Sequence, residues 1–121
     1  MNVTLGLRRA LQLNPQGIAI LEGERQLTWS ALGERVCRLA GALRQHGVAK
    51  GDRVAVLMLN STRYLELYLA VAWAAAIIVP LNIRWSVAEN RDAIEDCGAR
   101  LLMSTTRLSR PESRWRRRYP A

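Results

Sequence analysis

The sequence predicts an α/β fold: a partial parallel sheet with covering helices, a small N-terminal hairpin and an irregular basic tail. Three short runs rich in Val, Leu and Ile, at Arg53–Leu59, Ile77–Val79 and Ala99–Met103, have the composition of buried strands. The segments between these runs show the apolar spacing of helices. Strands that alternate with helices at these lengths are typical of βαβ crossovers, which produce parallel sheets.

The first half of the chain predicts a helix, a hairpin and a longer helix. The first helix is expected over Thr4–Leu13, with its Thr residue as the N-cap. Two extended runs, Ile18–Leu21 and Gln26–Trp29, flank the sequence Glu-Gly-Glu-Arg and predict a hairpin. Apolar residues recur at helical spacing over Ser30–His46, and Gly47 suits the left-handed conformation that ends a helix.

The second half predicts two more helices between the strands. Asn60 or Ser61 is expected to cap the first of them. Ser86 and Glu89 form a capping box that opens the second, and Gly98 is expected to end it. The apolar residues expected on one side of the first of these helices are Tyr64, Leu67, Tyr68, Val71 and Ala72.

The positive charge is concentrated at the end of the sequence. The 121 residues carry a formal charge of +8, but residues 1–103 hold 12 basic and 9 acidic side chains, whereas 104–121 hold six Arg and one Glu. We therefore expect one subdomain over 1–103, followed by a disordered Arg-rich tail over 104–121. The tail combines the charges of Arg114, Arg116, Arg117 and Arg118 with the stacking surfaces of Trp115 and Tyr119, as single-strand nucleic-acid binders do. Many Arg-rich ends share this composition, so we do not expect a nucleic-acid partner.

The sequence predicts neither a membrane span nor a disulfide. The apolar run Leu67–Leu81 has 15 residues and contains Pro80, whereas a span needs about 18 or more. The first residues do not have the pattern of a signal peptide. Cys37 and Cys97 fall within amphipathic helical patterns and are expected to be small buried hydrophobes. A reduced, cytoplasmic protein is the expectation that fits them.

Three features invite a functional interpretation. The loop from Gly47 to Asp52 has two glycines and a lysine, but a helix precedes it and a strand follows, which favours a tight turn over a phosphate loop. The carboxylates of Glu89, Asp92 and Asp96 share a helix face that suits either a metal or solvent, and without a companion His we expect solvent. The single histidine, His46, sits in a last helical turn, where positive charge suits the helix dipole. We therefore predict no catalytic, cofactor-binding or metal-binding residue.

Several short stretches, in order and at matching spacing, carry a resemblance to a known family. They are Leu27-Thr28-Trp29 with Leu32, Arg38 to Leu43 leading to Gly47-Val48, Gly51 to Ala55, Asn60 with Tyr64-Leu65-Glu66, and Ala72-Trp73-Ala74 running into Val79 to Asn82. Together, over about 90 residues between 15 and 103, they resemble the N-terminal portion of the AMP-forming acyl-CoA synthetases of the adenylate-forming superfamily.

The resemblance implies an activity for the family. Its members activate a carboxylic acid with Mg-ATP to an acyl-adenylate and then transfer the acyl group to coenzyme A. The phosphate-binding loop, the ribose-binding acid and the catalytic lysine lie later in the family, which implies that this portion binds no ATP, Mg or CoA. Ala31 replaces a common Glu, so the capping box of Thr28 loses one half. Ala75 replaces a usual Gly, with slight strain where positive φ is required.

These observations lead to two hypotheses. The first is a truncated acid–CoA ligase that contains only scaffold and is inactive alone, in which a shifted reading frame would explain the sequence after Met103. Its partner would be the remainder of a ligase. The alternative is an interaction module that self-associates through an open sheet edge or binds anionic polymers through its Arg tail. The acid substrate cannot be inferred from this portion.

Overall fold

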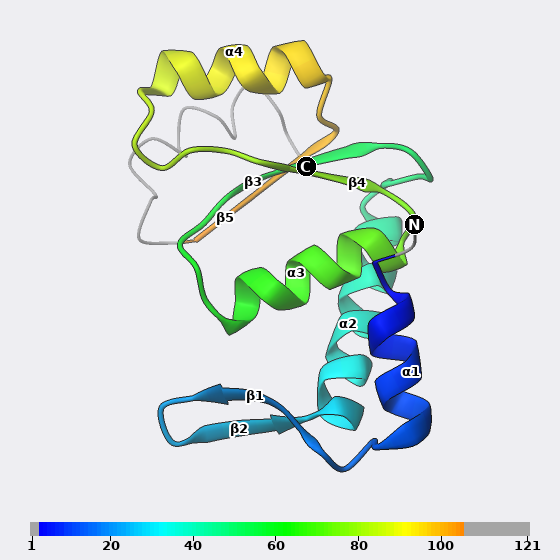
Figure 1. Ribbon diagram of the computed structural model, residues 1–121. Coiled ribbons are helices and arrows are strands. Elements are labelled where there is room, and N and C mark those ends of the chain that lie inside the picture. The colour runs from blue at the N-terminus through cyan, green and yellow to red at the C-terminus, as the bar shows by residue number, and fades with distance from the viewer. Residues whose placement is uncertain (1–2, 106–121) are drawn as a thin grey trace.

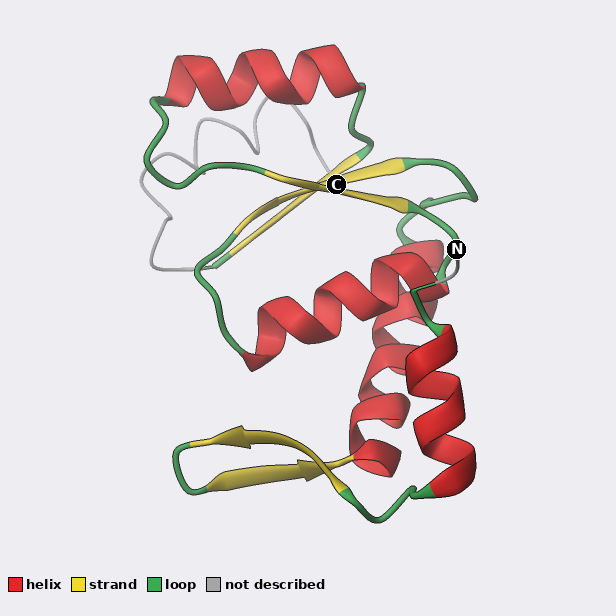
Figure 2. Ribbon diagram, in the orientation of Figure 1, coloured by secondary structure: helices red, strands yellow, loops and turns green. Residues whose placement is uncertain are grey.

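The computed structural model describes residues 3–105 and has the α/β fold that the sequence predicts. A three-stranded parallel sheet, a two-stranded antiparallel hairpin and four helices make up the described part (Figure 2). The Arg-rich tail expected over 104–121 lies outside the described residues apart from its first two positions. The helices are α1 (Leu5–Leu13), α2 (Trp29–Gln45), α3 (Thr62–Trp73) and α4 (Val87–Cys97), and the strands are β1 (Ile18–Glu22), β2 (Arg25–Thr28), β3 (Arg53–Leu57), β4 (Ile77–Pro80) and β5 (Leu101–Ser104).

The parallel sheet has the order β4-β3-β5, so the chain crosses over β3 when it passes from β4 to β5. Figure 1 shows α3 against one face of this sheet and α4 against the other. β3 pairs with both neighbours, and its residues 54–57 are buried. The predicted arrangement of a central strand covered on both faces is therefore confirmed for β3.

The two outer strands are less buried than the sequence predicted. The all-apolar composition of β4 indicated a buried strand, but Ile77 is 52% exposed. In β5 only Leu101 is buried, and the three residues after it are half-buried. Apolar composition cannot distinguish a central strand from an edge strand, because that difference depends on which strands pair.

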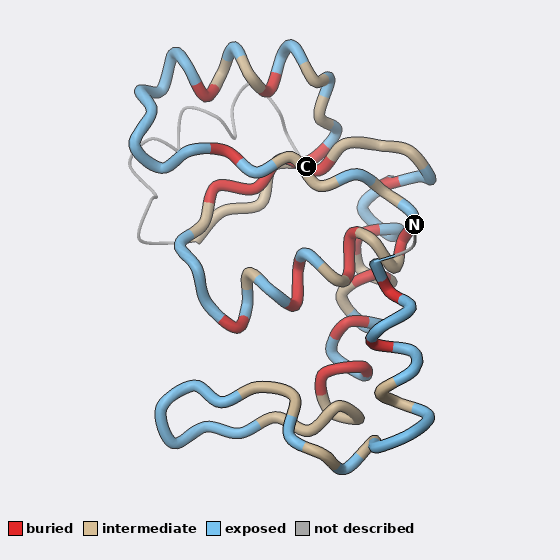
Figure 3. The backbone as a smooth tube through the Cα atoms, in the orientation of Figure 1, coloured by how far each residue is buried: buried red, intermediate tan, exposed pale blue. Residues whose placement is uncertain are grey.

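Two clusters of buried side chains form the core, one on each face of the sheet. The larger cluster joins α2, α3 and one side of β3, with Leu32, Val36 and Leu67 among its members. The smaller cluster packs Ala55 and Ile94 between the sheet and α4. In Figure 3 the buried positions lie along β3 and on the facing sides of α2 and α3. The larger core thus holds the helical layer against the sheet.

The N-terminal helix and the hairpin pack beside α2. A bulge between Ile18 and Ile20 shifts the strand alternation, so that Ala19 and Ile20 are both half-buried while the residues on either side are exposed. The guanidinium of Arg8 lies 4.2 Å from the ring centre of Trp73 and connects α1 to α3. Thr4 is the N-cap of α1, as predicted: it is buried and its carbonyl accepts from Arg8 N–H, although its side chain makes no capping hydrogen bond.

The other three helices begin with the predicted caps. Thr28 accepts a hydrogen bond from Ala31 N–H, and Ala31 offers no carboxylate in return, so half of that capping box is present. Ser61, of the two predicted alternatives, caps α3. Ser86 forms the full capping box of α4. Tyr68, which was expected on the apolar side of α3, is exposed because the side that faces α2 is formed by Glu66, Leu67, Ala70 and Val71.

The turn between α3 and β4 contains the strained residue that the resemblance implied. Ala75 has a φ of 59°, which makes it the one non-glycine residue with positive φ among residues 3–105. The left-handed region is unfavourable for any residue with a Cβ atom.

Among residues 3–105, no helix is both long and apolar enough to cross a membrane.

Candidate functional site

The sheet order defines where a ligand would be sought in this fold. In open α/β sheets, ligands bind beyond the carboxyl ends of the strands, where successive crossovers run to opposite sides. Here β4 lies on one side of β3 and β5 on the other. A ligand is therefore expected beyond the carboxyl ends of β3 and β5. The segment after β3 brings Ser61 and the N-terminus of α3 to the same end of the sheet. These residues are the first candidate site.

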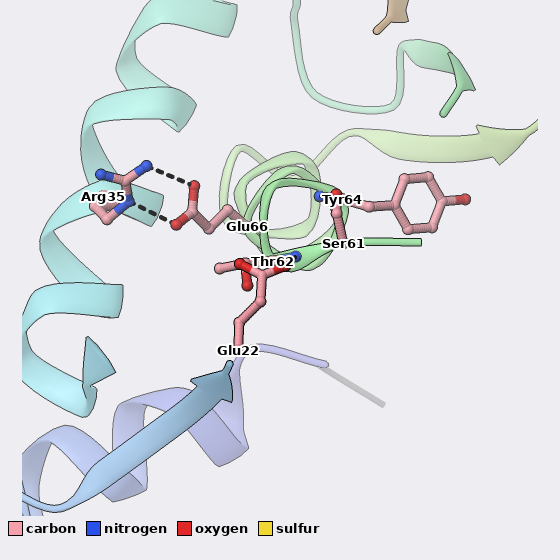
Figure 4. Close-up of polar contacts among 6 residues, drawn as sticks. All are labelled: Glu22, Arg35, Ser61, Thr62, Tyr64 and Glu66. Carbon is pink, nitrogen blue, oxygen red and sulfur yellow. Dashed lines mark hydrogen bonds and ion pairs between the residues drawn. The ribbon is translucent and has the colours of Figure 1, made fainter. Parts of the chain in front are cut away.

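The N-terminus of α3 is already bound by acceptors of the chain itself. The Ser61 hydroxyl accepts from Tyr64 N–H at 3.2 Å, and the Glu22 carboxylate accepts from Thr62 N–H at 3.4 Å. Figure 4 shows Glu22 reaching this helix from the hairpin. Hydrogen bonds from the Thr62 side chain and backbone lower the pKa of Glu22 below its ordinary value. A free anion would therefore have to displace a carboxylate.

One turn further along α3, a partly buried ion pair joins this helix to α2. Arg35 Nε and Nη2 donate to the two carboxylate oxygens of Glu66 at 2.5 and 3.1 Å (Figure 4). The Glu66 side chain is 7% exposed, and that of Arg35 is 43% exposed. The hydrogen bonds and the charge of Glu66 raise the pKa of Arg35, which keeps the guanidinium charged. Both carboxylate oxygens are engaged, so the pair holds two helices together and offers no free base.

The sequence alone did not predict this pair, since Glu66 was noted only within a stretch that resembles the family. The available signal was a single carboxylate among the apolar residues of α3, because an acidic side chain is rarely buried without a partner. The identity of that partner, 31 positions earlier, depended on the packing of α2 on α3.

The loop from Gly47 to Asp52 is the tight helix-to-strand turn that the sequence favoured. Gly47 and Gly51 have φ values of 84° and 83°. The Asp52 carboxylate accepts from Ala49 N–H at 2.8 Å and lies 4.0 Å from the guanidinium of Arg100. A carboxylate inside the loop repels phosphate. It also accepts from a backbone N–H that a phosphate would need as a donor. The loop therefore does not fit the phosphates of ATP.

The acidic face of α4 is a solvent-exposed surface in which two carboxylates already have partners. Glu89 accepts from Ser86 N–H and Oγ, and these hydrogen bonds lower the pKa of Glu89. Asp92 is paired with Arg91 at 3.2 Å. These residues and Asp96 line a shallow depression beside Trp85. No group of three His, Cys, Asp or Glu side chains suited to a metal ion exists within residues 3–105.

The remaining candidate residues lie apart from these positions. The His46 ring Nδ1 lies 2.9 Å from the Ala42 carbonyl, one turn back in its own helix. Both cysteines are free thiols. The prediction that Cys37 is buried is wrong, because it follows Val36 on α2 and points away from the buried stripe of that helix. Cys97 is half-buried, and its thiol contacts the Ile94 carbonyl.

Comparison with known proteins decides the family. The AMP-binding enzyme family matches residues 7–117, which is most of the chain. This chain belongs to the AMP-binding enzyme family. The family match continues beyond Met103, where the resemblance in the residues ended. The predicted recognition as an N-terminal portion of an acyl-CoA ligase is confirmed.

Among the relatives of this AMP-binding chain are CoA ligases that are much longer. A feruloyl-CoA synthase of Amycolatopsis is 44% identical over 99 residues, which cover 82% of this chain and 20% of that protein. A 3-hydroxybenzoate–CoA ligase of Aromatoleum is 38% identical over 84 residues, covering 69% of this chain and 16% of the ligase. The chain thus spans about a fifth of the length of the curated relatives it matches.

Solved structures agree with the AMP-binding fold. A fatty acyl CoA synthetase of Mycobacterium tuberculosis superposes with a TM-score of 0.88 at 28% identity, covering 93% of this chain and 23% of that one. The N-terminal domain of FACL13 from the same organism superposes at 0.87, also at 28% identity, covering 100% and 31%.

Proposed function

We propose that the chain supplies the opening scaffold of an AMP-forming acid–CoA ligase and does not activate acids by itself. The observation that carries the proposal is the family match over residues 7–117 in a chain that covers only 20% of a feruloyl-CoA synthase. In the complete ligase, a carboxylic acid, ATP and CoA would give acyl-CoA, AMP and pyrophosphate. The partner of this scaffold would be the remainder of the ligase.

ATP, Mg and CoA are the cofactors of the complete ligase in this proposal, and three contacts argue against phosphate binding by the described residues. The donors at the start of α3 are bound by Ser61 and Glu22. The glycine loop is bound by Asp52. We therefore assign cofactor binding to the rest of the ligase. The exposed, unpaired thiol of Cys37 suits a reducing compartment, and on this basis we propose a cytoplasmic location.

The contribution of the chain to catalysis would be rigidity. Arg35 and Glu66 fix the angle between α2 and α3, and Glu22 attaches the hairpin to the same helix. Both contacts are made by α3, which begins directly after β3 beside the switch point. Correct geometry in a supporting layer matters, because small displacements of reacting groups lower rates strongly.

A chimera tests the proposal. Residues 1–105 would replace the matching fifth of the Amycolatopsis feruloyl-CoA synthase, and formation of feruloyl-CoA would be measured. We expect ferulate-dependent activity with unchanged preference among aromatic acids, because this portion supplies scaffold and no substrate contact. The control is the same chimera with Arg35→Ala. We expect this variant to have a lower thermal stability than the chimera and the same preference for ferulate. A folded chimera without activity would contradict the scaffold role.

The isolated chain provides the complementary measurement. Without groups to orient ATP, it should catalyse no acid-dependent exchange of pyrophosphate into ATP. Exchange above the level of a no-enzyme blank, with any fatty or aromatic acid, would show that the chain contains a catalytic site of its own.

A further inference from the structure

The N-terminal hairpin has a packed base and an exposed tip. At the base, Ala19 and Ile20 pack against the larger core cluster. The N–H of Trp29, the first residue of α2, donates to the Gly17 carbonyl at 3.0 Å and joins the two ends of the hairpin. Residues 21–26, which form the tip, are all exposed. The two halves of the hairpin are therefore held in place by different interactions.

A carboxylate attaches the tip to α3. Glu22 accepts from Thr62 N–H at 3.4 Å and also interacts with the Thr62 hydroxyl, in the first turn of the helix (Figure 4). Within residues 3–105, the hydrogen bonds between the tip and α3 are confined to this pair. Thr62 is itself 7% exposed, so the acceptor of the tip meets a residue that belongs to the packed part of the fold.

The charges around Glu22 favour this contact only while the carboxylate is ionised. Hydrogen bonds from the Thr62 side chain and backbone lower the pKa of Glu22, and the guanidinium groups of Arg25 and Arg63 lower it further. Arg25 lies opposite Glu22 in the hairpin, and Arg63 follows Thr62 on α3. Without the negative charge, one cation would remain on each side of the contact, and like charges repel. The carboxylate thus makes the approach of the tip to the helix favourable.

We propose that residues 21–26 form a strap that Glu22 holds closed on the first turn of α3, and that the strap opens as a unit while the base of the hairpin stays packed. Segments with few buried contacts open locally at a lower free-energy cost than the core. The exposed tip meets this condition, and the half-buried base does not. Opening frees the Thr62 N–H, which lies just beyond the carboxyl end of β3. The strap therefore controls whether a backbone donor beside the switch point is occupied.

A matched pair of substitutions tests the strap in the full chain. Glu22→Gln keeps the size of the side chain and removes its charge, and Glu24→Gln makes the same change two positions away on the same tip. Thr62→Val weakens the contact from the side of the helix, because it removes the hydroxyl that Glu22 contacts. Far-UV circular dichroism would verify that each variant is folded.

Amide hydrogen exchange, followed by NMR, measures the opening of the strap. We expect the protection factors of residues 21–26 to fall about two- to fivefold in Glu22→Gln and in Thr62→Val, which corresponds to the loss of a carboxylate contact at a helix N-terminus. The protection factor of the Trp29 amide, at the base, should stay unchanged in both variants. Glu24→Gln should match wild type at the tip and at the base. In about 1 M NaCl, the difference between Glu22→Gln and wild type should shrink, because salt screens exposed charges.

Three results would overturn the proposal. Equal protection of the tip in a folded Glu22→Gln and in wild type would show that the carboxylate does not hold it. Equal loss of protection in Glu22→Gln and Glu24→Gln would assign the effect to the net charge of the tip. A loss of protection at Trp29 as large as the loss at the tip would show that the whole hairpin opens and that no separate strap exists. None of these results affects the feruloyl-CoA chimera, so this inference and the proposed function can fail separately.

Discussion

Replacing Arg35 by Ala should destabilise the fold far more than replacing a neighbouring arginine. The substitution leaves the Glu66 carboxylate, 7% exposed, without its bidentate partner. Removing one member of a buried pair costs about 3–5 kcal/mol. Because 43% of the Arg35 side chain is exposed, solvent screens part of this effect, and we expect roughly 2 kcal/mol. For a domain of this size, that corresponds to a decrease in Tm of about 6–10 °C.

The matched control is Arg38→Ala on the same helix. Arg38 pairs with Glu34 at 3.4 Å, but both side chains are more than half exposed, and the loss should be about 0.5 kcal/mol or less. Urea unfolding followed by circular dichroism gives the free energy of unfolding of both variants. The measurement is made at low protein concentration so that self-association does not contribute. Glu66→Gln and the double variant complete a cycle, in which we expect a coupling of about 1–2 kcal/mol. If Arg35→Ala and Arg38→Ala are equally stable, the pair does not hold α2 to α3.

Two further substitutions test local features of the backbone. Ala75→Gly should stabilise the chain by about 0.5–1 kcal/mol in urea unfolding, because Gly relieves the left-handed strain, whereas Ala88→Gly on the exposed face of α4 should cost about 1 kcal/mol. A loss of stability in Ala75→Gly would mean that the turn is unstrained. Glu89→Gln should be less stable than wild type at neutral pH. This difference should disappear in acid, because a lowered pKa in the folded state stabilises above the unfolded pKa and this stabilisation is lost as Glu89 is protonated. A difference that is constant from pH 7 to pH 3 would exclude the carboxylate as its source.

Features that depend on neighbours in the sequence were predictable. The capping hydrogen bonds of Ser61 and Ser86 involve residues three positions away. The hairpin and the turn at Gly47 were predicted for the same reason, whereas the strain at Ala75 was implied only by the resemblance to the family. The α/β class followed from periodicity, since strands and helices of these lengths alternate in few ways.

Only the tertiary structure determined which apolar and charged side chains are covered. Cys37 is exposed and Ile77 half-exposed although both lie in apolar patterns, because burial depends on whether another element packs on that side. The pairing of Glu66 with Arg35, and of Glu22 with the start of α3, joins residues 31 and 40 positions apart. Periodicity has a range of a few residues, so it specifies the elements and the apolar stripe of each. The choice of partners for those stripes and charges is made only when the helices and strands pack together.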